Sequence, residues 1–156
     1  KRLAVLARSV ADLARRRPAR LVLAGWNMAE YARRIGIASL PFVEVHDKPD
    51  DATMRRLMRS VDVAVQLRET THGESSAAVV ELLACGTPLV VTGEGSFAEL
   101  PPRLATFVAA HCPPEPLAEA IERAAKARVT GPELADLLAP LSPTAFTRRF
   151  AEIVAA

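Results

Sequence analysis

The sequence is poor in the residues that hold metal ions or form covalent cross-links. Among 156 residues there are two cysteines and three histidines. Cys85 and Cys112 lack a CxxC spacing, and His46, His72 and His111 are too scattered for a metal-binding motif. These scarcities exclude a disulfide framework and a zinc site, and they indicate a reducing, cytoplasmic setting.

Long apolar runs, net charge and aromatic residues are also scarce. No uninterrupted apolar run approaches the roughly 18 residues of a membrane span, and no signal-peptide pattern opens the sequence. The net charge is only +2, and aromatic residues make up 4% of the chain. The basic residues near the start have no aromatic residues between them, so no nucleic-acid partner is expected. Arg15, Arg16 and Arg17 are interpreted as the end of a helix, with a binding patch as the alternative.

What the sequence does contain is enough for a buried core. Hydrophobic residues make up 50% of the chain and charged residues 24%, which is typical of one globular domain over residues 1–156. The sequence opens at Lys1 inside a helical pattern and without an initiating Met. We therefore expect this domain to be part of a longer chain.

Strand and helix patterns alternate along most of the sequence. Apolar residues recur at helical spacing over residues 2–16, and Pro18 ends that pattern. Short apolar runs closed by glycine or polar residues predict strands at 20–25, 41–47, 61–67, 88–92 and 105–110. Further helices are predicted at 27–35, 50–60, 75–85 and over most of 114–156.

This alternation predicts a doubly wound α/β fold. Right-handed crossovers then build one parallel sheet that helices cover on both faces. Ligands of such sheets bind beyond the carboxyl ends of the strands. The loops after residues 25, 46, 67 and 92 are therefore expected to frame a site.

The loop at residues 68–76, RETTHGESS, carries the strongest chemical signal. Gly73 permits a close backbone approach, and Ser75 or Ser76 can cap the following helix. The first amides of that helix and the positive end of its dipole favour an anion or a hydroxyl group. The loop therefore predicts a ligand contact at the start of this helix.

One carboxylate, Glu81, lies between apolar neighbours in this helix. Glu74 precedes it by seven residues, so we expect both on one helical face, two turns apart. A carboxylate in an apolar setting needs hydrogen-bond partners, and two hydroxyl groups of a ligand would supply them. The alternative is that the Glu81 side chain lies on a solvent-exposed face of the helix or pairs with an arginine.

The segment VDVAVQLRETTHGESSAAVVELLACGTPLVVTGEGSFAELP (61–101) resembles the signature of the retaining GT-B glycosyltransferases of family 4. Members show an aspartate-led strand, a loop with a glutamate, a helix with a second glutamate, Ala-x-Gly-x-Pro and a glycine-rich turn with glutamate. The matching positions are Asp62, Glu81, Ala84, Gly86, Pro88, Gly95 and Glu99. The order of all elements fits as well, so the resemblance covers nearly the whole chain. It implies the C-terminal, nucleotide-sugar-binding lobe of a two-lobed GT-B protein.

The resemblance implies how the donor would be held. Glu81 would bind the ribose hydroxyls of the nucleotide, and the amides of Ser75 and Ser76 would meet the donor sugar or phosphate. Backbone near Gly25 and around His46 and its neighbour Val45 would line the base pocket.

It also implies which groups would act on the reacting bond. Lys1 falls where the family places a lysine that neutralises the diphosphate, and Arg68 is a further candidate for that charge. The family's first glutamate corresponds to Gly73 here, and Glu74 follows one place later. We expect a subgroup in which Glu74 takes over the sugar contact beside Gly73, and the competing explanation is a degenerate, inactive lobe.

The activity implied is transfer of a hexosyl group from a nucleoside-diphosphate sugar to a glycan or lipid-linked acceptor, with retained anomeric configuration. Cations and amides would stabilise the departing diphosphate, so neither a metal nor a cofactor is expected, and the nucleotide sugar is a substrate. The acceptor would bind a missing N-terminal lobe, so the fragment alone is expected to be inactive, and peripheral membrane association of the full-length protein is a further expectation. The alternatives are a noncatalytic GT-B-like interaction domain and an unrelated doubly wound regulator.

Three other places in the sequence carry weaker signals. Residues 93–95 (GEG) predict a turn, after which Ser96 and Glu99 have the spacing of a capping box. His72 is a candidate phosphate donor, with simple exposure as the alternative. Trp26 is expected to pack, with stacking on a base as the alternative.

Overall fold

The computed structural model describes residues 2–70, 72, 74–128 and 130–155. Lys1 and Gly73, two of the predicted site residues, lie outside these ranges. The elements in chain order are α1 (Leu3–Ala14), β1 (Leu21–Gly25), α2 (Met28–Arg34), β2 (Val43–Asp47), α3 (Asp51–Ser60), β3 (Ala64–Gln66), α4 (Ala77–Ala84), β4 (Leu89–Thr92), the 3-10 helix η1 (Gly95–Glu99), β5 (Ala105–Val108), α5 (Pro114–Ala124), α6 (Gly131–Leu138), the 3-10 helix η2 (Ala139–Leu141) and α7 (Pro143–Val154). The predicted alternation of strands and helices is confirmed.

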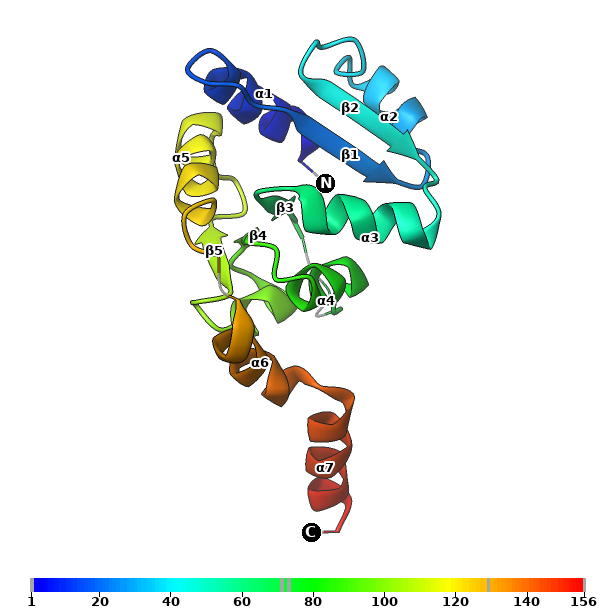
Figure 1. The fold of residues 1–156 in the computed structure, drawn as a ribbon, viewed down its shortest axis with the longest axis vertical. Coiled ribbons are helices and arrows are strands. Elements are labelled where there is room, and N and C mark those ends of the chain that lie inside the picture. Colours follow the sequence, from blue (N-terminus) through cyan, green and yellow to red (C-terminus); the bar gives the residue numbers. More distant parts are fainter. Residues whose placement is uncertain (1, 71, 73, 129, 156) are drawn as a thin grey trace.

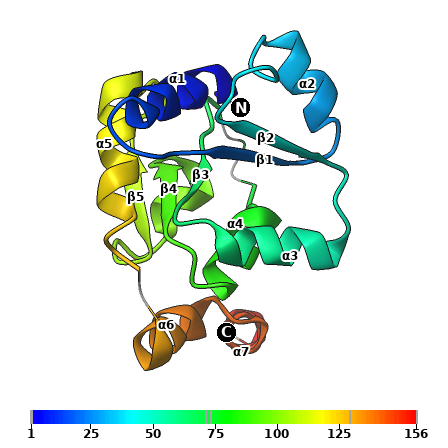
Figure 2. The ribbon, with the colours of Figure 1, turned by 45° about the horizontal axis from the view of Figure 1, so that its top comes forward.

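The strands form two parallel sheets, and this differs from the single sheet that the sequence predicts. One sheet holds β1 and β2, with Leu21 opposite Val43, and the other has the order β3-β4-β5, with Ala64 opposite Leu89. Figures 1 and 2 show β1 and β2 as a layer apart from β3, β4 and β5. The α/β class with parallel strands and crossover helices is confirmed, but no described strand joins β1 to β3.

Burial explains why the strand at the centre of the larger sheet forms. All four residues of β4 are buried, which is typical of a parallel strand covered on both faces. Leu89 packs in a cluster with residues of α4, η1 and β5, while Val90 belongs to a second cluster that α1, β1 and α5 share. Strand β4 thus ties the two clusters together.

Helix α4 ends at the point that the sequence predicts. Gly86 has a φ of 65°, which L side chains adopt only at a cost. Its amide donates to the Leu83 carbonyl, and the Thr87 amide donates to the Leu82 carbonyl. These two bonds form a Schellman motif that turns the chain from α4 into β4.

The last helix, α7, projects from the body of the molecule (Figure 1). It exposes Phe146, Phe150 and Ile153, and the two phenylalanine rings stack with centroids 6.2 Å apart. None of the helices in the described part of the chain combines the length and apolar character needed to cross a bilayer.

Leu89→Ala is expected to lower the free energy of unfolding by about 2–5 kcal/mol, because it opens a cavity at a side chain that is 1% exposed. Leu141→Ala, at a leucine that is 49% exposed, is the matched control and should change the stability far less. Denaturant titration measures both variants. Equal losses in the two would contradict this placement of the core.

Asp50 caps the N-terminus of α3, and its contribution to stability depends on pH. Its carboxylate accepts the Thr53 amide at 2.7 Å, and this bond holds the pKa of Asp50 below its ordinary value of 3.8. A carboxyl with a lowered pKa stabilises the fold above its unfolded pKa, and this contribution is lost as the pH falls through its folded pKa. Asp50→Ala should therefore destabilise the protein at pH 7, and in denaturant titrations the difference from the unchanged protein should shrink as the pH falls below 3.8 and vanish below the folded pKa of Asp50. A difference that stays constant down to pH 2 would contradict the role of the charge.

Candidate functional site

The loop between β3 and α4 is organised by an ion pair between Arg68 and Glu74. The Arg68 guanidinium lies 2.6 Å from the Glu74 carboxylate and also donates to the Glu74 carbonyl at 3.0 Å. The other carboxylate oxygen accepts the His72 amide at 2.8 Å. Two predicted catalytic residues therefore contact each other, and the Arg68 side chain is only 21% exposed.

The same arginine joins this loop to the end of β4. Its backbone amide donates to the hydroxyl of buried Thr92 at 2.7 Å, and its guanidinium lies 4.5 Å from the centroid of the Phe97 ring. The Ser96 hydroxyl donates to the Glu74 carbonyl at 2.8 Å. The carboxyl ends of β3 and β4 thus meet at one place, as parallel strands require. The predicted capping box at Ser96 is wrong, because that hydroxyl bonds to the loop and no side chain caps η1.

The first turn of α4 has backbone amides that can donate to a ligand. Ser76 precedes the helix with extended backbone, and its carbonyl accepts the amides of Val79 and Val80. The amides of Ala77 and Ala78 make no hydrogen bond among the described residues. The predicted cap is wrong for Ser76, whose side chain makes no capping bond. Donors at a helix start, near the positive end of its dipole, suit an anion or a hydroxyl oxygen.

Glu81 lies on the exposed face of this helix. The exposed positions of α4 are Ala77, Val80, Glu81 and Ala84. None of the hydrogen bonds or ion pairs among the described residues engages the Glu81 carboxylate. Glu74 precedes the helix, so the prediction that the two glutamates share one helical face is wrong. The carboxylate sits one turn beyond the free amides, about 6 Å along the axis.

Arg2 links a third strand end to this region, a role that no sequence pattern indicates. Its guanidinium donates to the carbonyls of Ala110 and Cys112, both at 2.9 Å, and lies 3.5 Å from the Glu69 carboxylate. Arg2 thereby links the start of α1 to the segment after β5 and to the loop after β3. Burial raises the pKa of the Cys112 thiol, against the opposing charges of Arg2 and Arg123, so this cysteine is unsuited to act as a thiolate.

The predicted base-pocket residues lie at the carboxyl ends of β1 and β2. Gly25 has a φ of 145° and ends β1, where its carbonyl accepts the Lys48 amide at 3.0 Å. His46 is opposite Ala24 in the register, and its ring lies 2.6 Å from the Glu44 carboxylate. Both residues are therefore in the segments predicted for them, and the His46 side chain contacts Glu44.

The turn after β1 is more open than expected. Trp26 is 77% exposed, so the preferred interpretation as a packed residue is wrong. Its ring lies 5.2 Å from the Lys48 ammonium group, a cation-π contact. The Asp47 carboxylate accepts the Met28 amide at 2.7 Å and so holds the start of α2.

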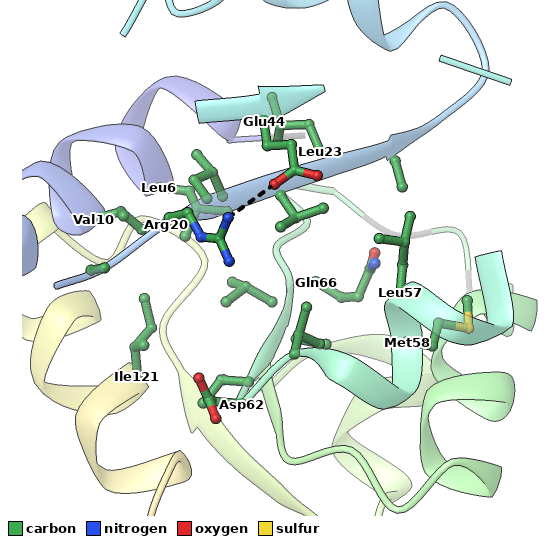
Figure 3. Close-up of a pocket in the computed structure, with 18 of the residues that line it drawn as sticks. Leu6, Val10, Arg20, Leu23, Glu44, Leu57, Met58, Asp62, Gln66 and Ile121 are labelled. Atoms are coloured by element: carbon green, nitrogen blue, oxygen red, sulfur yellow. Dashed lines mark ion pairs between the residues drawn. The ribbon is translucent and has the colours of Figure 1, made fainter. Parts of the chain in front are cut away.

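A large cavity lies elsewhere in the described part of the chain. It measures about 1150 Å³ and is lined by residues of α1, β1, α3, β3, α4 and α5. Arg68, Glu74, Glu81, Gly25 and His46 are not among its lining residues. Figure 3 shows apolar side chains from the helices and strands around it, with the Arg20–Glu44 ion pair at its border. Within the described residues, no group of three or more His, Cys, Asp or Glu side chains could hold a metal ion.

Glu74→Ala should loosen the loop before α4, because it removes the acceptor of the His72 amide and the partner of Arg68. Hydrogen bonds to charged groups contribute about 1.5–3 kcal/mol, so exchange of the His72 amide is expected to speed up by at least roughly tenfold. Hydrogen exchange followed by NMR measures this rate. Glu94→Ala, at an exposed glutamate before η1, is the control and should leave the rate unchanged. An unchanged rate in Glu74→Ala would contradict the pairing.

Comparison with known proteins identifies the family. The model of the family described as Glycosyl transferases group 1 matches residues 1–127, which leaves only α6, η2 and α7 outside. Among solved structures, the chain is similar to AviGT4, a glycosyltransferase involved in Avilamycin A biosynthesis, with a TM-score of 0.59 and 20% identity. That likeness covers 97% of this chain and 48% of AviGT4, so the chain spans about half the length of that protein. No curated protein sequence matches the chain. The likeness to AviGT4 shows a Rossmann-like GT-B lobe, and the match of the family model shows that the chain belongs to the group 1 glycosyl transferases.

Proposed function

We propose that this chain is the donor-binding lobe of a retaining glycosyltransferase, which moves a hexosyl group from a nucleotide sugar to a glycan or lipid-linked acceptor. The lobe corresponds to residues 1–156 and works with an N-terminal lobe in the cytoplasm. The proposal is supported by membership of the group 1 family and by the GT-B fold.

The observation that carries the proposal is the arrangement of α4. Its first turn offers the free amides of Ala77 and Ala78, and the Glu81 carboxylate lies one turn further along the exposed face. A nucleoside diphosphate has the matching chemistry. Phosphate oxygens accept hydrogen bonds from amides at a helix start, and ribose hydroxyls donate to a carboxylate, which only accepts.

The loop before α4 supplies the remaining polar groups. Glu74 accepts hydroxyls of the donor sugar, and the amides of Ser75 and Ser76 meet the sugar or the phosphate. Arg68 lies beside Glu74, and the contact allows its charge to be shared between that carboxylate and a diphosphate. Lys1 adds a second cation. Gly73, which precedes Glu74 in the sequence, is proposed as a further donor contact.

The base is proposed to bind at the ends of β1 and β2. Backbone at Gly25 and His46 lines this region, and the exposed Trp26 ring offers a flat apolar surface beside it. Positioning by these contacts and electrostatic stabilisation of the departing diphosphate by cations and amides are the contributions of this lobe to catalysis. Neither needs a metal or a cofactor.

Glu81→Ala should weaken the binding of UDP or GDP by the protein roughly 10- to 100-fold, because hydrogen bonds to a charged group contribute about 1.5–3 kcal/mol. Calorimetric titration with each nucleotide measures the dissociation constant. Glu119→Ala is the matched control, since Glu119 is an exposed helical glutamate on α5.

The control should bind as tightly as the unchanged protein. Equal affinities for Glu81→Ala and Glu119→Ala would contradict the ribose contact. No binding of either nucleotide by the folded polypeptide would instead favour a noncatalytic GT-B-like interaction domain.

A further inference from the structure

The Glu74 carboxylate occupies an anion-binding arrangement within its own loop. One carboxylate oxygen lies 2.6 Å from the Arg68 guanidinium, and the other accepts the His72 amide at 2.8 Å. A guanidinium and a backbone amide that face one anion are donors that proteins use for carboxylates and phosphates alike. The carboxylate therefore fills a place that suits a phosphate oxygen as well.

Arg68 is the fixed member of this pair. Its backbone amide donates to the buried Thr92 hydroxyl at 2.7 Å, and its guanidinium lies 4.5 Å from the centroid of the Phe97 ring. The Arg68 side chain is 21% exposed, whereas that of Glu74 is 52% exposed. An exchange of partners at this place would thus move the glutamate side chain and leave the arginine where it is.

The backbone of Glu74 is held independently of its carboxylate. Its carbonyl accepts the Arg68 guanidinium at 3.0 Å and the Ser96 hydroxyl at 2.8 Å. Neither of these bonds involves the Glu74 side chain. Rotation about the side-chain torsions can therefore carry the carboxylate away from Arg68 while the loop keeps its backbone bonds.

The proposed function gives Arg68 a second anion, the diphosphate of the donor. Glu74 precedes Ala77, whose amide makes no hydrogen bond among the described residues, by three positions, which span at most roughly 10 Å of chain. A phosphate at the start of α4 and the Glu74 carboxylate are then two anions beside one cation, and they repel each other. The carboxylate has to give up the Arg68 guanidinium when a diphosphate takes it.

A nucleotide sugar offers the displaced carboxylate a new partner, and a free nucleotide does not. A carboxylate only accepts hydrogen bonds, and the hydroxyl groups of a hexose donate them. With a sugar present, the carboxylate exchanges the guanidinium for hydroxyl groups. Without a sugar, it either keeps the guanidinium from the diphosphate or loses a charged partner, and both outcomes weaken binding.

We propose that Glu74 sets the preference of this lobe for a nucleotide sugar over the free nucleoside diphosphate, because its carboxylate holds Arg68 until sugar hydroxyls replace that contact. This inference rests on the proposed function and adds to it a discrimination between donor and product. After the sugar has been transferred, the carboxylate returns to Arg68 and favours release of the nucleoside diphosphate.

Glu74→Gln tests the proposal, because it removes the charge and keeps an oxygen that accepts the His72 amide. Calorimetric titration of the protein with UDP and GDP measures the dissociation constants, and the nucleotide that binds more tightly is used for the comparison. The variant is expected to bind this free nucleotide about two- to fivefold more tightly than the unchanged protein, since Arg68 has lost its internal anion. Equal or weaker binding by the variant would overturn the proposal.

The nucleotide sugar should respond in the opposite direction. Of UDP-glucose, UDP-galactose and GDP-mannose, the one that the unchanged protein binds most tightly is titrated into both proteins. The variant is expected to bind it about tenfold more weakly, because hydrogen bonds to a charged group are lost. Unchanged or tighter binding of the nucleotide sugar would show that sugar hydroxyls do not replace the Arg68 contact, and the proposal would fall.

Glu69→Gln is the matched control. Glu69 follows Arg68 in the sequence, its side chain is 57% exposed, and its carboxylate lies 3.5 Å from the Arg2 guanidinium instead. This variant removes the same charge from the same loop and should leave both dissociation constants within about twofold of the unchanged protein. An equal gain in affinity for the free nucleotide in Glu69→Gln would assign the effect to net charge and contradict the proposal.

The unchanged protein separates this inference from the proposed function. If it binds none of these nucleotides and nucleotide sugars, the proposed function fails and the inference fails with it. If it binds them and the two glutamate variants behave alike, the inference alone fails.

Discussion

The arrangement of the candidate site depends on how Arg68 is held. Its backbone amide is fixed by the buried Thr92 hydroxyl, its guanidinium lies against the Phe97 ring, and its charge is paired with Glu74. One residue thus connects the end of β3, the end of β4 and the loop that enters α4. Because that loop sets where α4 begins, Arg68 also sets where the free amides and Glu81 are presented. The proposed function requires this placement, since a nucleotide contacts both groups only if the helix starts at the rim of the sheet.

The second constraint is the pairing of strand edges. Parallel strands of an α/β lobe are covered by helices on both faces, so their peptide groups have little access to water and need neighbouring strands. Here β4 has neighbours on both sides, whereas β1 and β3 each have one. The space between them is bordered by apolar side chains from α1, α3, α4 and α5 and also by charged side chains such as Arg20, Glu44 and Asp62.

Much of the fold could be predicted from local patterns. The helix stop at Gly86 follows from a residue that tolerates a positive φ, and β4 follows from an apolar run too short for a helix. The division into two sheets could not be predicted, because it depends on which strand lies beside β1, and no local pattern reports that. The site shows the same limit. Glu81 was identified from its lone charge among apolar residues, but its exposure follows from which face of α4 packs. The contacts of Arg2 join residues more than a hundred positions apart, so spacing could not reveal them.

The central claim is that a nucleoside diphosphate binds across the start of α4 and along its exposed face. Chemical-shift mapping of the protein during titration with UDP or GDP tests this claim most directly. The account predicts the largest shifts at the amides of Ala77 and Ala78 and around Glu81, with further shifts near Gly25 and His46. Shifts confined to residues that line the large cavity, with α4 unaffected, would contradict it.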